Sequence, residues 1–385
     1  MQKYIHDEIR NNLRSLQKGL SVPQQKALAE VVHGLFTVGT PILRHLAQDD
    51  EKSAKKQGEK YSHHLRNIDL ETKIERFALK QALSDLKKDS IIAYDLTDIA
   101  KDTARKMEKL APVFDGSKCC GTTGYCLHGV GISADLVRLK IHDGNRYTQN
   151  QQRRMIVEEI ALKLKGQGIW IFDRGNDDKA FFYFLASKLN LRFIARLRGN
   201  RQVVIQKTGV SEKVENLRPG KYRIQLLNRN NNKVVPQFYT LIIKKHLPHK
   251  PPIRLITNLD YRRYSKNNLV TLYLERWGVE NSFRRIKTKF NLEKIRVLHY
   301  KTFVNLVGLV QFAPVCSTQL FRTLQKNTSA LLAGLLLYYK QFLRLKHLSP
   351  NIDSFITFLQ QILKPYIYRN HSPPNQLSLL FPNSL

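Results

Sequence analysis

The chain has 385 residues, and its 64 Lys and Arg against 31 Asp and Glu give a formal net charge of +33. Hydrophobic residues make up 42% of it, which excludes a globally disordered protein and allows two or three domains with a core. Four cysteines are too few for a disulfide framework, and the positive charge favours a polyanionic partner, most economically a nucleic acid.

The sequence does not indicate secretion or a membrane span. The first ten residues include acids and no apolar segment of the signal-peptide kind follows them. The apolar stretch 303–320 is interrupted by Asn305, Gln311 and Pro314, and the apolar run 331–339 is too short to span a bilayer. We therefore expect a cytoplasmic protein with no membrane partner.

The positive charge lies in the middle of the chain. Residues 1–90 hold 16 basic and 12 acidic residues, whereas residues 188–296 hold 26 basic and 6 acidic residues. A basic interior segment flanked by ordered elements favours a binding groove built into the fold over a loose basic tail. A solvated basic face is the alternative.

Residues 1–88 are predicted to form a helical N-terminal domain. Ser21-Val22-Pro23 is a typical helix start, and apolar residues then recur at helical spacing up to Phe36. Val38-Gly39-Thr40 could be the turn of a DNA-binding helix-turn-helix whose second helix starts at Pro41, although many helix pairs look the same. A charged loop is expected over 49–61 and a further helix over 70–86.

Residues 89–198 alternate between strand and helix patterns. The predicted strands cover 91–94, 125–133, 136–142, 168–172 and 191–197, the predicted helices cover 151–165 and 180–189, and a glycine-rich turn is expected over 120–124. Three adjacent strands followed by helix, strand, helix and strand is the order of a ribonuclease-H-like core. We therefore predict an α/β fold with a mixed sheet flanked by helices.

The remaining chain divides into three predicted segments. Residues 199–250 are basic and strand-like, which predicts an all-β insertion with turns at Pro219-Gly220 and at 230–232. Residues 251–300 are expected to give the last core strand, at 254–259, and one long helix over 266–291. Residues 301–385 are expected to form C-terminal helices, with a frayed end from 370 onward.

Two acids follow apolar strands in the predicted core. Asp95 follows Ile91-Ile92-Ala93-Tyr94, and Asp173 follows Gly168-Ile169-Trp170-Ile171-Phe172 and precedes Arg174-Gly175. Isolated carboxylates at strand ends can hold the divalent cations that phosphodiester chemistry uses. Each acid taken alone could instead be a strand-end or helix N-terminal cap, whereas Asp177 and Asp178 fit caps of the next helix better.

The predicted helix 266–291 presents a polar row beside its buried side. At 100° per residue, Tyr273, Arg276, Glu280 and Lys287 fall within an arc of about 60°. A separate apolar stripe formed by Leu272, Val279, Phe283, Ile286 and Phe290 would face the core. The alternative is a solvated face with an Arg276/Glu280 pair at i, i+4, which would contribute only tenths of a kcal/mol, roughly.

The row Tyr273-x2-Arg276-x3-Glu280-x6-Lys287 resembles the Tyr-Arg-Glu-Lys signature of a large branch of bacterial insertion-sequence DDE transposases. Asp95-Leu96-Thr97 and Ile171-Phe172-Asp173-Arg174-Gly175 resemble the first and second catalytic blocks of that family. A β-rich insertion between the second Asp and the Glu is a family feature as well. The resemblance covers roughly residues 90–300.

The resemblance implies that Asp95, Asp173 and Glu280 hold two Mg²⁺ ions, for which Mn²⁺ can substitute. Tyr273, Arg276 and Lys287 would grip DNA phosphates. It further implies a magnesium-dependent endonuclease that cuts transposon ends and joins the freed 3′-OH to double-stranded target DNA. Such enzymes generally work as homodimers in a synaptic complex, here in the bacterial cytoplasm at the nucleoid.

Two departures and several alternatives stay open at this point. Asn176 stands where the family usually has an aromatic residue, and Asp98 is a rival for the first acid. A cleavage-only nuclease with the same core, a non-catalytic DNA-binding relative and a basic RNA-binding protein are the competing functions. A zinc site at Cys119, Cys120, Cys126 and His128 is disfavoured because no second ligand pair follows. Cys126 and His128 share one strand face, so a core role is expected of them instead.

Overall fold

The computed structural model describes residues 2–46, 54–116, 118–133, 135–227, 234–245, 249, 251–326 and 330–368. The chain forms two compact units, each built from separate segments. Unit 1 comprises Met1–Phe77, Thr103–Lys109 and Arg285–Leu385, and unit 2 comprises Ala78–Asp102 and Leu110–Arg284. The helices α5 (Glu71–Leu83) and α9 (Trp277–Thr288) each contribute residues to both units.

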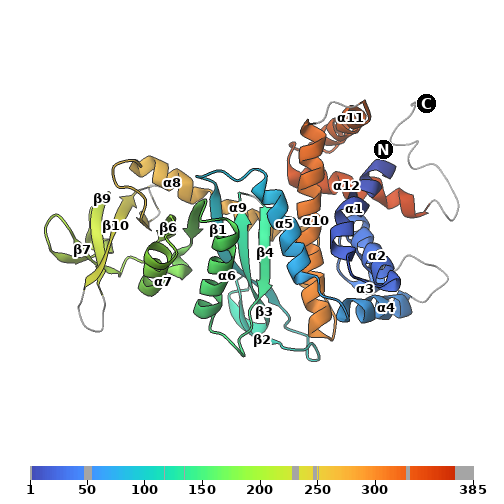
Figure 1. Ribbon diagram of the computed structural model, residues 1–385, viewed down its shortest axis with the longest axis horizontal. Coiled ribbons are helices and arrows are strands. Elements are labelled where there is room, and N and C mark those ends of the chain that lie inside the picture. Colours follow the sequence, from blue (N-terminus) through green and yellow to red (C-terminus); the bar gives the residue numbers. More distant parts are fainter. Residues whose placement is uncertain are drawn as a thin grey trace. The chain divides into compact units, whose positions relative to one another are not determined.

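Unit 2 contains one mixed sheet with the path β2-β3-β1-β5-β6-β11-β10-β9-β7-β8, with β4 paired to β3 (Figure 1). β1 is parallel to β5, and β5 is parallel to β6, whereas β3 runs antiparallel to both β1 and β4. The strands are β1 (Ile91–Ala100), β2 (Ala111–Asp115), β3 (Cys120–Ile132), β4 (Asp135–Ile141), β5 (Ile169–Phe172), β6 (Phe193–Arg196), β7 (Gln202–Ile205), β8 (Ser211–Lys213), β9 (Gly220–Leu227), β10 (Val234–Lys244) and β11 (Ile253–Thr257).

The order β4-β3-β1-β5-β6, with β3 antiparallel to its neighbours, is the ribonuclease-H-like arrangement that the sequence predicts. The helix α6 (Gln149–Lys163) connects β4 to β5, and α7 (Lys179–Tyr183) with a following π turn at Phe184–Lys188 connects β5 to β6. The predicted α/β fold with a mixed sheet flanked by helices is therefore confirmed. The basic insertion adds β7 to β10 to the same sheet, next to β11.

Alternation along the strands assigns their side chains to two buried layers. Tyr94 and Phe172 belong to a cluster that includes residues of α6 and α7. Ile91, Ile169 and Ile171 belong to a second cluster that includes residues of α8 (Lys266–Leu274). Since Asp95 and Asp173 continue the odd-numbered series, both acids follow the layer that α8 covers.

Three predictions about local structure are wrong. Residues 120–124 lie in β3 and pair with β2, which the sequence analysis missed. Gly124 lets the backbone come close there, because a Cβ on it would lie 2.1 Å from the carbonyl oxygen of Ile99. Residues 54–61, predicted as loop, belong to the helix α4 (Ala54–Arg66), while 47–53 lie outside the described residues.

The predicted long helix over 266–291 is two helices, α8 and α9, separated by a turn at Glu275 and Arg276. Gly129 and Gly131 of β3 leave space for the side chains of Phe283 and Val279 on α9. A Cβ on Gly129 would lie 2.3 Å from Cζ of Phe283, and one on Gly131 would lie 3.2 Å from Cγ2 of Val279. The helix therefore packs directly on the backbone of β3. Gly129 pairs with Asp95 on the neighbouring strand β1, so this contact lies next to Asp95.

Unit 1 is helical. Its α2 begins at the predicted position, because Ser21 forms a capping box with Gln24, and it ends at Gly39 with a positive φ of 69°. After that turn, Leu43–Leu46 are helical, and the rest of the expected second helix, from 47 onward, lies outside the described residues. The helices are α1 (Gln2–Gln17), α2 (Val22–Val38), α3 (Leu43–Leu46), α4, α10 (Tyr300–Lys326), α11 (Ala330–Leu345) and α12 (Ile352–Tyr368), with the first turns of α5 and the last of α9.

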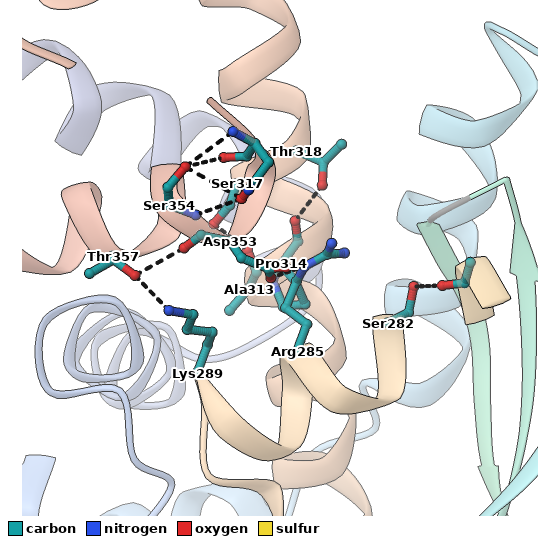
Figure 2. A network of polar contacts seen from close by, with 12 residues as sticks. Ser282, Arg285, Lys289, Ala313, Pro314, Ser317, Thr318, Asp353, Ser354 and Thr357 are labelled. Carbon is teal, nitrogen blue, oxygen red and sulfur yellow. Dashed lines mark hydrogen bonds and ion pairs between the residues drawn. The ribbon is translucent and has the colours of Figure 1, made fainter. Parts of the chain in front are cut away.

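Two ion-pair and hydrogen-bond contacts fix α12 to the end of α9, and Figure 2 shows them from close by. Arg285 donates from Nε to Oδ1 of Asp353 at 2.7 Å, and Lys289 donates from Nζ to Oγ1 of Thr357 at 2.7 Å. Arg285 is buried, so this charge is neutralised inside unit 1. The predicted C-terminal helices are thus present, and the end from 370 lies outside the described residues.

Among the described residues, α10 is the one helix long and apolar enough to cross a membrane by length and composition. However, 78% of its apolar window is buried within the protein. Asn305 on this helix is fully buried and accepts a hydrogen bond from the backbone N–H of Leu70 at 3.1 Å. These contacts are typical of a core helix.

Candidate active site

Asp95 lies where the sheet opens. The parallel pairing of β1 with β5 ends at Tyr94 and Phe172, whereas the pairing of β1 with β3 continues to Ala100. Asp95 and Asp173 are therefore the first residues beyond the shared edge of two parallel strands. Ligands and substrates bind at such carboxyl ends of parallel strands in open α/β sheets.

One arginine joins two of the three predicted acids. Arg276 donates from Nη1 to Oδ2 of Asp95 at 2.9 Å, and its Nη2 lies 2.6 Å from Oε1 of Glu280. The i, i+4 pair of the alternative interpretation is thus present, but Arg276 also reaches an acid 181 positions earlier in the chain. Asp95 and Arg276 are largely buried, with side-chain exposures of 17% and 12%, while Glu280 is 45% exposed.

The carboxyl of Asp95 has a raised pKa. Burial, and after it the charge of Asp173, raise this pKa to about 7 against the opposing effect of Arg276. Its Oδ1 accepts a hydrogen bond from the backbone N–H of Leu96 at 2.9 Å. Asp95 and Asp173 are therefore close enough to repel, which is the condition under which a bound cation stabilises both carboxylates.

Asp173 is held by the residue that departs from the family pattern. Asn176 donates from Nδ2 to Oδ1 of Asp173 at 2.5 Å and accepts from Nη1 of Arg153 at 2.9 Å. Asp173 begins a short 3₁₀ turn without capping it through its side chain, so the N-cap interpretation of Asp173 is not supported. Asp178 caps α7 as the sequence analysis predicts, whereas Asp177 is buried and paired with Arg201 at 2.6 Å.

Tyr273 lies beside Arg276, and Lys287 pairs with Glu293. Tyr273 is only 4% exposed, within the apolar layer around α8, and the guanidinium carbon of Arg276 lies 5.9 Å from its ring centroid. Lys287 lies in the last turn of α9, where its Nζ is 2.9 Å from Oε1 of Glu293. Trp277, at the start of α9, is 61% exposed, so it is not a core residue.

Oxygen donors from three carboxylates fit hard cations such as Mg²⁺. In the described part of the chain, however, no three His, Cys, Asp or Glu side chains lie in an arrangement that could hold a metal ion. The guanidinium of Arg276 contacts both Asp95 and Glu280 there. The donor chemistry therefore fits the cation, while Arg276 supplies the positive charge at this position.

Asp98 and Cys126, two of the alternative site residues, are paired neighbours on β1 and β3. Asp98 lies on β1 beside Cys126, whose pKa is raised by burial and by this neighbouring carboxylate. Cys126 and His128 are buried as the sequence analysis expected of core residues, and Cys119 and Cys120 are exposed. Nδ1 of His128 forms a hydrogen bond with the hydroxyl of Tyr94 at 2.6 Å, in the layer that α6 covers.

The transposase DDE domain family matches residues 86–313, which is more than half of the chain. The chain belongs to this family. It is a DDE transposase, and membership implies an enzyme of metal-dependent DNA cleavage and strand transfer. The matched range contains the whole ribonuclease-H-like sheet and the three predicted acids.

The fold is similar to that of a known transposase. The chain matches the cryo-EM structure of a piggyBac transposase synaptic complex with hairpin DNA, with a TM-score of 0.51 and 10% sequence identity. The match covers 91% of this chain and 75% of the other. At this identity the likeness concerns the fold. No curated protein matches the chain.

Proposed function

We propose that this DDE transposase cuts transposon ends and joins their 3′-OH groups to target DNA with Asp95, Asp173 and Glu280 as its catalytic acids. The observation that carries the proposal is the Asp95–Arg276–Glu280 ion-pair bridge at the open end of β1 and β5. It joins the first and last acids of the predicted triad. We also assign the chain to the insertion-sequence branch with the Tyr-Arg-Glu-Lys signature.

The three carboxylates would hold two Mg²⁺ ions, with Mn²⁺ as a substitute, and the ions would activate the attacking oxygen and stabilise the leaving one. Asp95 is held rigidly by β1 and by the N–H of Leu96, so it provides a fixed ligand. Glu280 is the most exposed of the acids in contact with Arg276 and can turn toward a cation at little cost. Arg276, once released from the acids, would contact a DNA phosphate.

Basic side chains of unit 2 support double-stranded DNA as the partner. Arg262, Arg263 and Lys266 are exposed just before and at the start of α8, which leads to the acids. Others are exposed on the insertion and its flanks: Arg198, Lys207, Lys213, Arg218 and Arg223. Such groups release counterions when they neutralise phosphates, so binding should weaken steeply with added salt.

Tyr273, Lys287 and Trp277 complete the proposed DNA contacts. Tyr273 would support the phosphate contact of Arg276 from its buried position, and Lys287 would contact a DNA phosphate. The exposed indole of Trp277 can stack on a base. We further propose that the protein acts as a homodimer in a synaptic complex, in the cytoplasm at the nucleoid. A cleavage-only nuclease with the same core remains the competing function, and a non-catalytic DNA-binding relative is disfavoured because all three acids are present.

The test is the substitution Glu280→Gln, which keeps the shape of the side chain and removes its charge. Cleavage of DNA carrying the ends of the element, with Mg²⁺ or Mn²⁺, should fall to background, while binding of the same DNA in a gel-shift assay should stay close to wild type. Glu275→Gln is the matched control, since Glu275 is exposed in the turn just before Arg276. Cleavage by Glu280→Gln at the wild-type rate would overturn the assignment.

Strand transfer separates the proposal from the nuclease alternative. Wild-type protein is given pre-cut ends with free 3′-OH groups and a supercoiled target plasmid. Joined products support the transposase assignment. A protein that cuts intact ends but never joins pre-cut ones is a cleavage-only nuclease.

A further inference from the structure

A chain of directed hydrogen bonds ends on Asp173. Arg153 of α6 donates from Nη1 to Oδ1 of Asn176 at 2.9 Å, and Asn176 donates from Nδ2 to Oδ1 of Asp173 at 2.5 Å. Arg153 and Asn176 are 4% and 5% exposed. All three residues belong to unit 2, and they come from α6 and from the turn that follows β5.

The direction of this chain follows from the chemistry of its first member. A guanidinium can only donate hydrogen bonds, so the side-chain oxygen of Asn176 must face Arg153. The amide nitrogen of Asn176 must then face Asp173, because the two ends of an amide point in opposite directions. Arg153 thus determines that a donor, and not an acceptor, contacts the carboxylate of Asp173.

Arg153 is itself fixed on two sides. Its Nη2 lies 3.2 Å from Oδ2 of Asp178, and its guanidinium carbon lies 3.9 Å from the ring centroid of Phe181. Asp178 is in turn fixed as the N-cap of α7, where its Oδ1 accepts from the backbone N–H of Ala180 at 2.9 Å. The network is therefore anchored in α6 and α7, which are packed against the sheet.

We propose that Asn176 and Arg153 are positioning residues for Asp173, holding its Oδ1 so that Oδ2 is presented to a divalent cation. This inference rests on the proposed role of Asp173 as a metal ligand. Gly175 leaves room beside this carboxylate, since a Cβ on it would lie 3.2 Å and 3.3 Å from the two Asp173 oxygens and would crowd them. Hydrogen bonds from outer residues to a ligating carboxylate typically affect metal affinity by about 10–100-fold when lost.

The first variant is Asn176→Leu, which keeps the approximate size and removes both hydrogen bonds. Mn²⁺ binding is measured by calorimetry and by electron paramagnetic resonance on the full chain, and the Mn²⁺ concentration for half-maximal plasmid cutting is measured in parallel. We expect Mn²⁺ affinity to fall by about 10-fold or more. The maximal cutting rate at saturating Mn²⁺ should change much less than the half-saturating concentration.

Asn176→Leu also leaves the buried Arg153 with a lost acceptor, so it will lower the melting temperature. The double variant Arg153→Met/Asn176→Leu removes the guanidinium that lost this acceptor. Its melting temperature should rise again, whereas its Mn²⁺ affinity should stay low. It also keeps the test open if Asn176→Leu alone does not fold. Gln152→Met is the matched control, because the hydrogen bonds described for this buried amide of α6 go to Ile141, His142 and the backbone N–H of Asp143, and not to the three proposed catalytic acids.

Asp173→Asn distinguishes the proposed metal-ligand role of Asp173 from the positioning role of Asn176 and Arg153. Should Asp173→Asn bind Mn²⁺ as wild type does, the proposed role of Asp173 fails and the positioning role fails with it. Should Asp173→Asn lose Mn²⁺ while Asn176→Leu and the double variant stay within twofold of Gln152→Met, only the positioning role is overturned.

Discussion

The contact between α9 and β3 can be tested by substitution, and it holds the helix that carries Glu280 on the strand that pairs with β1. A Cβ on Gly129 would lie 2.3 Å from Cζ and 2.5 Å from Cε1 of Phe283, and Gly129 pairs with Asp95. Because Cβ atoms normally keep at least about 3.4 Å from such neighbours, Gly129→Ala must push α9 away from the sheet or force Phe283 into another rotamer. Either response disturbs the helix that carries Glu280.

The expected cost follows from known substitutions. Overpacking a core by one methyl group costs about 1–3 kcal/mol, and the ring of Phe283 is 6% exposed between the helix and the sheet. Replacing a glycine by alanine where no clash occurs stabilises a fold by about 0.4–1 kcal/mol, because the unfolded chain loses freedom. We therefore expect Gly129→Ala to lower the free energy of unfolding by about 1 kcal/mol relative to wild type, and by about 2 kcal/mol relative to a glycine-to-alanine change without a clash.

Gly121→Ala is the matched control on the same strand, since a Cβ there meets no atom within 4 Å. Phe283→Leu removes the clashing atoms, and alone it should cost about 1–2 kcal/mol through the cavity it leaves. In the double variant Gly129→Ala/Phe283→Leu the added methyl group fills part of that space. The double-mutant cycle should therefore show a favourable coupling of about 1–2 kcal/mol.

The assay is urea unfolding followed by far-ultraviolet circular dichroism, with metal-dependent DNA cutting measured on the same samples. Cutting should be lost in Gly129→Ala under conditions where the protein is still folded, and should return in part in the double variant. If Gly129→Ala is as stable as Gly121→Ala, or if the cycle shows no coupling, α9 does not pack on β3 at contact distance and the reasoning is refuted.

Two further predictions concern groups away from the acids. His33, stacked on His6, has its pKa lowered to about 4 by burial, by His6 and by Arg10, so its contribution to stability is complete above pH 6.5, the unfolded value, and is lost as pH falls toward 4. His33→Gln should flatten the fall in unfolding free energy between pH 6.5 and 4 by up to roughly 3 kcal/mol, whereas exposed His45→Gln should not. Asp177→Ala, which leaves Arg201 unpaired at a buried site, should cost about 3–5 kcal/mol in urea unfolding.

The sheet could be predicted from sequence because each core strand is a short apolar run with clear boundaries. The positions of Asp95 and Asp173 also followed, since both come directly after such runs. β2 could not be predicted in this way. Its residues Ala111–Asp115 are partly or fully exposed, so they carry no alternating pattern, and the glycines of β3 that pair with them are typical of turns.

The break between α8 and α9 has only a weak local signal, which is Gly278 two residues after the turn. Leu274, Glu275, Arg276 and Trp277 include neither proline nor glycine, and each has at least moderate helix propensity. The break is a tertiary effect: α8 packs with Tyr273 in one apolar layer, while α9 must descend onto the glycines of β3. A helical wheel over 266–291 therefore grouped Tyr273, Arg276 and Glu280, which do contact one another through Arg276, but it placed them on one continuous helix.

The spacing of Arg276 and Glu280 in the sequence indicates the site, but it does not show that Arg276 also contacts Asp95. At i, i+4 an exposed Arg–Glu pair contributes only tenths of a kcal/mol, roughly, and would have no further meaning. Here the same arginine also contacts buried Asp95, and yet burial and Asp173 still raise the pKa of Asp95 to about 7. Burial disfavours the charged form of Asp95, and the nearby charge of Asp173 disfavours it further. Keeping a buried carboxyl beside a second acid is unfavourable unless a cation offsets the repulsion, and this is the physical argument that the two acids serve a cation.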